Sequence, residues 1–265
     1  MTRTGQDVTR LGMSDLSFAN GVDHVGVVGA DLDALARAFQ ELGFRLTPMA
    51  AHAGGRTANR CAMLRDGGYL ELMATVPGHD SATLDRFLAR GPGAHILALD
   101  IADEAAVLAR LNRAGIKAEP SVTERDAGGA IARFGLIMPP DMPEGRVLLI
   151  HHHTRSLLWR PGFVTHPNGA LALTEAVYGA AIPAATMTHL SRIAGRPAEP
   201  DPLGGYRIPL ARGCIRVLPR EAAEELFPGA AGNAPIVGLT IATAVPEDRV
   251  VHAAGVAIRF TTAPG

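Results

Sequence analysis

Apolar residues follow two different periods along this 265-residue chain, and both periods first occur between residues 21 and 44. Residues 21–28 are an apolar run rich in valine, which is typical of a buried strand. Asp31 then precedes a segment whose apolar residues recur every three or four positions, which predicts a capped helix ending near Gly43. The apolar positions of this helix are Leu32, Leu35, Ala36, Phe39 and Leu42.

The same order of elements is predicted again further along the chain. The first unit is completed by strands at residues 44–51, 60–64 and 69–76. After a connecting helix at 80–90, the second unit has a strand at 93–101, a helix at 103–115 and strands at 117–123, 130–138 and 146–152. The third unit has a strand at 170–180, a helix at 183–194 and strands at 206–210 and 213–218. A helix at 221–227 leads to a shortened fourth unit, with a strand at 237–245, a helix at 247–254 and a strand at 256–261.

A repeated strand–helix–three-strand pattern predicts an α+β fold made of tandem βαβββ modules. We divide the chain into a flexible leader (residues 1–20), a first pair of units (21–153), a linker (154–169) and a second, degenerate and shortened pair (170–265).

Composition and charge limit the classes of partner. The chain has 25 Lys and Arg against 26 Asp and Glu, without a basic cluster, which argues against nucleic acid and an anionic membrane surface. Its start lacks the apolar core of a signal peptide, and no stretch is long enough to span a bilayer. The two cysteines, Cys61 and Cys214, are far apart, as expected for reduced thiols. We therefore expect a cytoplasmic protein that binds a small molecule, and the sequence is compatible with a homodimer.

Four predicted strands carry a side chain that can bind a metal ion, within a face that is otherwise apolar or mixed. These residues are His24, Glu71, His95 and His151. A polar group inside an apolar strand costs free energy unless it is hydrogen-bonded or coordinated. A single strand histidine is more often a satisfied core residue, and Glu71 could pair with an arginine. Recurrence in two successive units favours a shared site over these alternatives.

The stretches around these residues resemble the vicinal oxygen chelate superfamily, in particular its glyoxalase-like branch. They are Asp23–Val27, Gly68–Leu72, Gly93–Leu99 and Pro143–His151, in the order of the four strands that supply metal ligands in that family. The fold implied is that of glyoxalase, bleomycin-resistance protein and dihydroxybiphenyl dioxygenase, in which tandem βαβββ modules form curled, mainly antiparallel sheets. The fourth ligand position usually holds Glu, whereas this chain offers Leu149 or His151, and we favour His151 because leucine cannot ligate.

The resemblance implies one divalent metal ion (Zn, Ni, Mn or Fe), held by His24, Glu71, His95 and His151. In the family the metal holds two neighbouring substrate oxygens, and a glutamate ligand can also move protons, a catalytic role for which Glu71 is the candidate. We therefore expect a metal-dependent lyase or isomerase acting on a small carbonyl or vicinal-oxygen substrate. The alternatives are an extradiol-type ring-cleaving dioxygenase, which needs Fe(II), and a binding protein without turnover.

Further polar residues have both a functional and an ordinary interpretation. His52, Thr57 and Asn59 are candidates for substrate contact, although turn residues of these types also bond to nearby backbone. In the third unit Thr174 stands near the place of His24, and Arg216 at that of Glu71. Since these residues do not form a ligand set, we expect one metal site, in the first half.

Overall fold

The computed structural model describes residues 16–230 and 233–263, so the leader prediction for residues 1–15 lies outside the described residues. The first unit comprises β1 (Gly21–Val28), α1 (Leu32–Glu41), β2 (Ala50–Ala51), β3 (Thr57–Met63) and β4 (Tyr69–Thr75). Helix α2 (Ala82–Leu88) leads to β5 (Gly93–Asp100), α3 (Glu104–Arg113), β6 (Glu119–Asp126), β7 (Ile131–Met138) and β8 (Arg146–His152). A short 3₁₀ helix, η1 (Arg155–Leu157), follows β8.

In the described part of the chain, the second half repeats this order without the helix and one strand of the last unit. Its third unit comprises β9 (Ala170–Ala180), α4 (Pro183–Ala194), β10 (Glu199–Pro200), β11 (Tyr206–Pro209) and β12 (Cys214–Pro219). Helix α5 (Arg220–Leu226) leads to β13 (Ile236–Thr243), β14 (Asp248–Ala253) and β15 (Val256–Thr262). The fold is therefore α+β, as predicted, and the fourth unit contains strands without a helix among its described residues.

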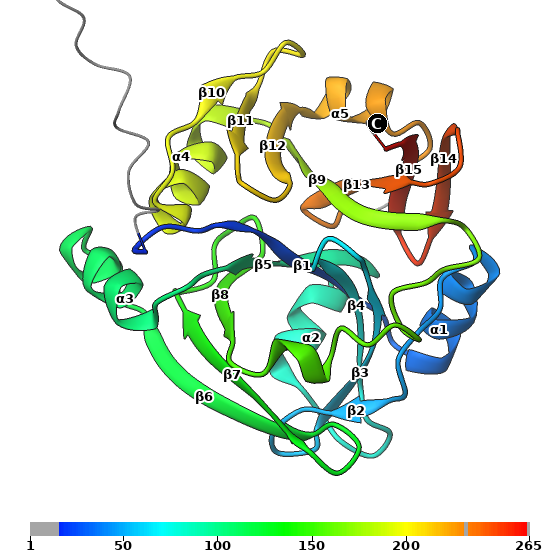
Figure 1. Ribbon diagram of the computed structural model, residues 1–265. Coiled ribbons are helices and arrows are strands. Elements are labelled where there is room, and N and C mark those ends of the chain that lie inside the picture. Colours follow the sequence, from blue (N-terminus) through cyan, green and yellow to red (C-terminus); the bar gives the residue numbers. More distant parts are fainter. Residues whose placement is uncertain (1–15, 231–232, 264–265) are drawn as a thin grey trace, which may run out of the picture.

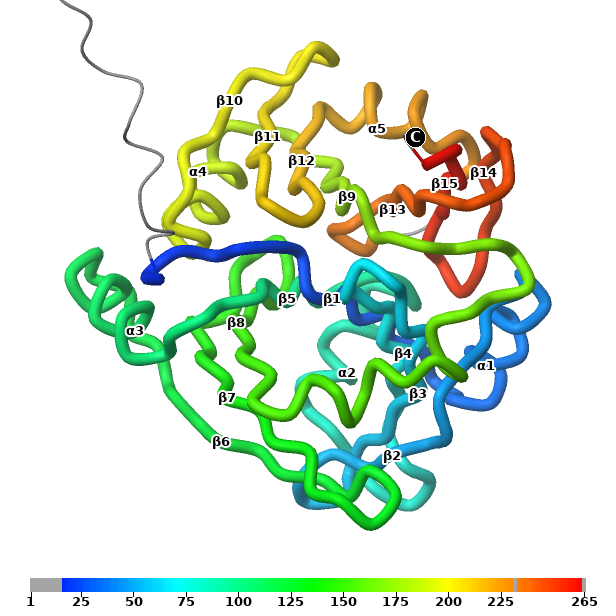
Figure 2. The backbone as a smooth tube through the Cα atoms, in the orientation of Figure 1, coloured from blue at the N-terminus to red at the C-terminus, as the bar shows by residue number. Residues whose placement is uncertain are grey.

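Each pair of units is joined through its first strands. Strand β1 pairs in parallel with β4 on one side and antiparallel with β5 on the other, and β8 pairs in parallel with β5. The second half repeats this pattern, because β9 lies between β12 and β13 and β15 pairs in parallel with β13. In Figures 1 and 2 the strands coloured blue to green curl into the lower half, and the yellow to red strands lie above them. The curled sheet of each half therefore surrounds a space between the paired units.

The two halves are also continuous with each other. The described strands form one fifteen-stranded sheet, in which Ile236 of β13 bridges Ala94 of β5. The ring of Phe44 stacks on that of Phe260 at a centroid distance of 5.9 Å, in a core shared by both halves. The linker at residues 154–169 therefore stays a proposed boundary between two pairs of βαβββ units, and the two halves share one sheet and one core. Among the described residues, every helix is too short or too polar to cross a bilayer.

The prediction of a helix at residues 247–254 is wrong. The segment forms β14, which pairs antiparallel with β15 through Asp248↔Thr261 to Ala253↔Val256. The turn between the two strands places Ala254 and Gly255 at φ of 49° and 79°, the left-handed conformation of a tight hairpin. The hairpin turn and the pairing with β15 determine the structure of this segment. The strand predicted at 44–51 is likewise reduced to Ala50–Ala51.

Candidate active-site cleft

His24 lies on β1 with both ring nitrogens engaged. Its Nδ1 atom donates to Oδ1 of Asp23 at 2.8 Å, and its ring stacks on Tyr69 at a centroid distance of 4.4 Å. Asp23 is fully buried and also accepts from Nε2 of His152 at 3.1 Å. Burial raises the pKa of Asp23, but the charges and hydrogen bonds of His152 and His24 outweigh it and hold that pKa well below its ordinary value. Asp23 therefore fixes His24 with Nε2 directed away from it.

The carboxylate of Glu71, on β4, faces Nε2 of His24. Its Oε2 atom lies 3.5 Å from Nε2 of His24, and its Oε1 atom lies 3.2 Å from Nε2 of His52. The side-chain amide of Asn59 donates to the same Oε1 atom. Burial alone would raise the pKa of Glu71, but the hydrogen bond with His52 and the charges of His24, His52 and Arg125 bring it to about 2. Glu71 is thus an ionised carboxylate facing two imidazoles.

His52 mirrors His24 in the way it is held. Its Nδ1 atom lies 2.9 Å from Oγ1 of Thr57, and its Nε2 atom faces Glu71. A histidine that binds a metal through one ring nitrogen usually has the other held by a hydrogen bond, which fixes its tautomer. Both imidazoles meet this requirement. Two imidazoles and one carboxylate are residue types that divalent transition metals bind, so the chemistry of this set is compatible with a metal.

The positions in the second unit that correspond to His24 and Glu71 are apolar. Asp103 caps α3 as Asp31 caps α1, and Ile96 precedes its cap by the same number of residues as His24 does. In the parallel pairs, Gly26 faces Glu71 in β1–β4, and the equivalent Ala98 faces Leu148 in β5–β8. Ile96 and Leu148 are therefore the counterparts of His24 and Glu71. All four line one cavity of about 410 Å³.

His95 and His151 do not join His24 and Glu71, and we correct the predicted four-residue set accordingly. His95 is next in sequence to Ile96, and His151 is next to Ile150; both isoleucines line the cavity. Because adjacent side chains of a strand point to opposite faces, the two histidines point away from the cavity. His95 stacks on Phe87 of α2 at 5.2 Å and bonds to the Gly91 carbonyl at 2.9 Å, and burial lowers its pKa. His151 instead contacts Glu104 of α3.

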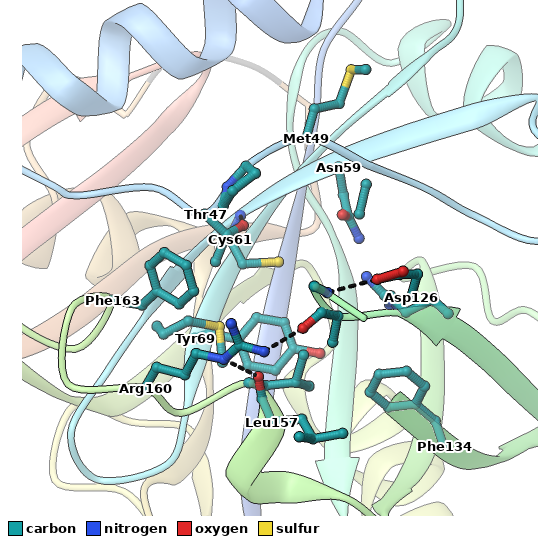
Figure 3. Close-up of a pocket in the computed structure, with 17 residues that line it drawn as sticks. Thr47, Met49, Asn59, Cys61, Tyr69, Asp126, Phe134, Leu157, Arg160 and Phe163 are labelled. Carbon is teal, nitrogen blue, oxygen red and sulfur yellow. Dashed lines mark hydrogen bonds between the residues drawn. The ribbon is translucent and has the colours of Figure 1, made fainter. Parts of the chain in front are cut away.

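The residues predicted to contact substrate do lie around the cleft. His52 and Thr57 line the larger cavity. Asn59 lines an adjoining cavity of about 200 Å³, which shares Tyr69, Arg125 and Phe134 with the larger one. Figure 3 shows this smaller cavity, with Phe134 on one side and Arg160 held by carbonyls of Leu157 and Ala127 on the other.

Sequence reasoning missed Asp23, Arg125 and Arg146. Arg125 of β6 and Arg146 of β8 are the two cationic side chains lining the larger cavity among the described residues. Asp23 could have been found, since a carboxylate beside a histidine within an apolar strand indicates a supporting hydrogen bond. The two arginines carried no comparable signal, because the residues that face the cleft from β6 and β8 depend on a register that their sequence does not specify.

The second half has an ion-paired group at the equivalent place. Cys214 pairs with Glu175 as Tyr69 pairs with His24, so Glu175, and not Thr174, corresponds to His24. Arg216 stands at the position of Glu71, as predicted, with Nη1 3.3 Å from Glu175. It also binds Asp201 through two hydrogen bonds of 2.8 and 2.9 Å. Arginine is a cation itself, so its charge at the position of Glu71 disfavours a metal ion there.

Comparison with known proteins agrees with this architecture. A hypothetical protein from Staphylococcus aureus shares the fold over 92% of this chain and 99% of its own, with a TM-score of 0.71 and 14% identity. Methylmalonyl-CoA epimerase from Mycobacterium tuberculosis is 27% identical over 54% of this chain and 95% of its own, with a TM-score of 0.42. A search of curated proteins gave no match. The profile of the glyoxalase-like domain matches residues 22–194, and the chain therefore belongs to the glyoxalase-like family of the vicinal oxygen chelate superfamily.

Proposed function

We propose that this protein is a metal-dependent lyase or isomerase acting on a small carbonyl or vicinal-oxygen substrate. The observation that carries the proposal is the convergence of His24 Nε2 and His52 Nε2 on the carboxylate of Glu71. Two imidazoles and one carboxylate suit zinc, iron, nickel or manganese and leave positions open for substrate. When bound, the metal would act as a Lewis acid toward neighbouring substrate oxygens.

The walls of the cleft favour a small, partly anionic substrate. Its volume of about 410 Å³ is in the ordinary range of small-molecule sites. Ile96 and Leu148 supply an apolar surface opposite His24 and Glu71, which suits a carbon skeleton. Arg125 and Arg146 both line the cavity, and Arg125 can bind a carboxylate or phosphate group. Arg146 is already paired with Asp141 through two hydrogen bonds of 2.8 and 3.0 Å.

Glu71 is the proposed proton carrier. A carboxylate with a pKa of about 2 stays ionised at neutral pH, but it is a weak base. Its proposed task is to accept a proton from a carbon next to a substrate carbonyl, where the proton is most acidic. Asp23 acts as a positioning residue, because it holds His24 in the orientation that directs Nε2 to Glu71.

Metal analysis and hydrogen exchange test this proposal together. Purified wild-type protein should bind a divalent metal at the cleft, and the double variant H24A/H52A should lose it, whereas H79A, a variant of a histidine outside the cleft, should retain it. A panel of small 2-oxo and 2-hydroxy acids should exchange the hydrogen next to the carbonyl with deuterium oxide in the wild type but not in E71Q. Equal metal content in wild type and H24A/H52A would exclude the metal site.

One specific observation also favours the dioxygenase. Two histidines and one carboxylate with open positions are the ligand set of non-haem Fe(II) oxygenases. Oxygen uptake by the iron-loaded protein with catechols separates this function from the lyase or isomerase. A protein that binds no metal and exchanges no hydrogen, but binds small molecules in the cleft, would instead support the binding-protein alternative.

A further inference from the structure

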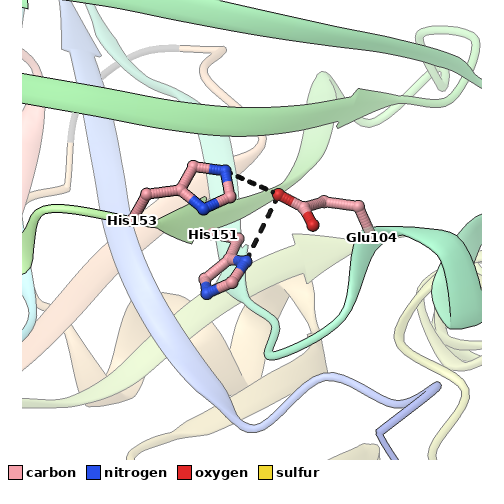
Figure 4. A group of neighbouring side chains, drawn as sticks. All are labelled: Glu104, His151 and His153. Atoms are coloured by element: carbon pink, nitrogen blue, oxygen red, sulfur yellow. Dashed lines mark ion pairs between the residues drawn. The ribbon is translucent and has the colours of Figure 1, made fainter.

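Glu104, His151 and His153 form a second group of ligand atoms, away from the cleft. Oε1 of Glu104 lies 3.2 Å from Nδ1 of His151 and 2.9 Å from Nε2 of His153. One ligand atom from each residue lies within 4.8 Å of the others. Figure 4 shows both rings directed at the same carboxylate oxygen. Ligands that share a tetrahedral zinc ion are separated by about 3.4 Å when each bond is about 2.1 Å, so these contacts already approach coordination distances.

The backbone holds the three residues in this arrangement. His151 and His153 come from the end of β8 and the residue after it, and the backbone amide of His153 donates to the Arg133 carbonyl of β7. Glu104 is the first residue of α3, and its carboxylate lies over Gly135 of β7. A Cβ atom at Gly135 would meet Oε1 of Glu104 at 1.9 Å, so a larger residue there would displace the flexible carboxylate from this position.

The ligand atoms are accessible and incompletely satisfied. The side chains of Glu104, His151 and His153 are 32%, 31% and 31% exposed, which allows an ion to enter. Nδ1 of His151 is nevertheless shielded from solvent and has no well-aligned hydrogen bond, although it faces Glu104. A buried imidazole nitrogen directed at a carboxylate, without a hydrogen bond between them, is suited to a cation that bridges the two.

We propose that Glu104, His151 and His153 bind a divalent transition metal of the zinc class, independently of the cleft. Two imidazoles and one carboxylate are a zinc ligand set, with a fourth position open to water, and oxygen-preferring Mg²⁺ or Ca²⁺ would not be favoured. The ion would link the start of α3 to the end of β8. His152, between the two ligands, points to the opposite face and bonds to Asp23, so the two sites lie on opposite faces of β8.

Zinc titration of the full-length protein in four forms separates the two sites. The forms are wild type, H24A/H52A, H151A/H153A, and the combination of all four substitutions, each titrated with Zn²⁺ against a chromophoric chelator. The expected stoichiometries are two, one, one and none. E104Q should weaken the remaining site of H24A/H52A by about 100-fold or more, at least as much as loss of a supporting partner. E119Q, at another glutamate of the same half, is the matched control and should leave binding unchanged.

The outcomes distinguish the second site from the cleft site. If H151A/H153A binds zinc with the same stoichiometry and affinity as wild type, the second site is excluded, whatever happens in the cleft. If wild type and H24A/H52A both bind one zinc and H151A/H153A binds none, the second site is supported and the cleft proposal fails. Cobalt substitution gives an independent readout, since a tetrahedral Co²⁺ absorption band in H24A/H52A should vanish when E104Q is added to that variant. The far-ultraviolet circular dichroism of each variant verifies that it is folded.

Discussion

Nε2 of His24 lies 3.5 Å from Oε2 of Glu71, while Nδ1 of the same ring donates to Asp23. In neutral His24 this leaves a lone pair, and not a proton, facing the carboxylate. The pair is therefore incomplete without added positive charge, from a proton or a cation. The hydrogen bond from Nδ1 to Asp23 determines this protonation of the ring. Removal of the Asp23 carboxylate should therefore change the properties of Nε2, on the opposite side of the ring.

Replacing Asp23 by Asn should weaken metal binding at the cleft by about 10- to 100-fold, as is usual for partners that orient a ligating histidine. An amide can present its oxygen to Nδ1, but it no longer provides the charge that His24 and His152 share. Competition with a chelator measures the affinity. The control variant D33N changes an exposed carboxylate of α1 and should leave the metal affinity of the cleft unchanged. An unchanged affinity in D23N would show that His24 does not bind metal through Nε2.

Restoring polar residues at the two counterpart positions should strengthen the cleft site. Ile96 and Leu148 correspond to His24 and Glu71, so the variant I96H/L148E would supply two further ligands from the second unit. Without metal, a new carboxylate in an apolar wall should lower the melting temperature. With metal, the same carboxylate is coordinated, and the stabilisation by metal should exceed that of wild type. Thermal unfolding with Zn²⁺ and with chelator measures both changes.

The control for this variant uses the positions one residue away. H95I/L149E alters the opposite faces of the same strands and should gain no metal-dependent stabilisation. If I96H/L148E is stabilised by metal no more than wild type, then Ile96 and Leu148 do not face His24 and Glu71 closely enough to share an ion.

The order of the strands could be read from the sequence, but the face of β5 could not. Residues 93–99 are all buried, because the strand is covered on both sides, so apolar alternation gives no sign of which side chains enter the cleft. Burial therefore does not distinguish His95 from Ile96 as the side chain that enters the cleft. The helix cap at Asp103 was visible in the sequence and sets the register against Asp31. Counting back from the caps would have selected Ile96, whereas matching histidine to histidine selected the wrong face.

His52 and Asn59 could be anticipated as cleft residues but not as partners of Glu71. Their contacts depend on how the segment between α1 and β3 folds back, where the predicted strand 44–51 is mostly irregular. The helix predicted at 247–254 failed for a related reason. Its turn residues Ala254 and Gly255 were visible, but the partner strand that makes a hairpin favourable is a tertiary feature.

That hairpin provides a stability test. Gly255 has φ of 79°, and an added Cβ would meet the Pro92 carbonyl oxygen at 2.1 Å. Gly255→Ala should therefore destabilise the protein by about 2–4 kcal/mol, since backbone strain and a backbone clash add. Gly54→Ala is the matched control, because Gly54 also has a positive φ (85°) but has open space around it. Urea unfolding should show the larger loss in G255A, and equal losses would exclude the clash.

The buried ion pair of the second half predicts a pH-dependent loss of stability. Arg216 holds Asp201, whose side chain is 1% exposed, through two hydrogen bonds. Burial raises the pKa of Asp201, but these bonds and the Arg216 charge outweigh it, so the pKa in the folded protein lies below its ordinary value. A lowered pKa stabilises the fold above the unfolded pKa of about 3.9, and this contribution is lost as pH falls through the folded value.

Arg216→Met should therefore cost about 3–5 kcal/mol at pH 7, because it leaves buried carboxylates unpaired. The difference from wild type should shrink below about pH 4. Arg207→Met breaks an exposed pair with Glu199 and should cost about 0–1 kcal/mol. Urea unfolding of the three proteins from pH 3 to pH 7 measures these values, and a cost for R216M that is independent of pH would contradict the ion-pair origin.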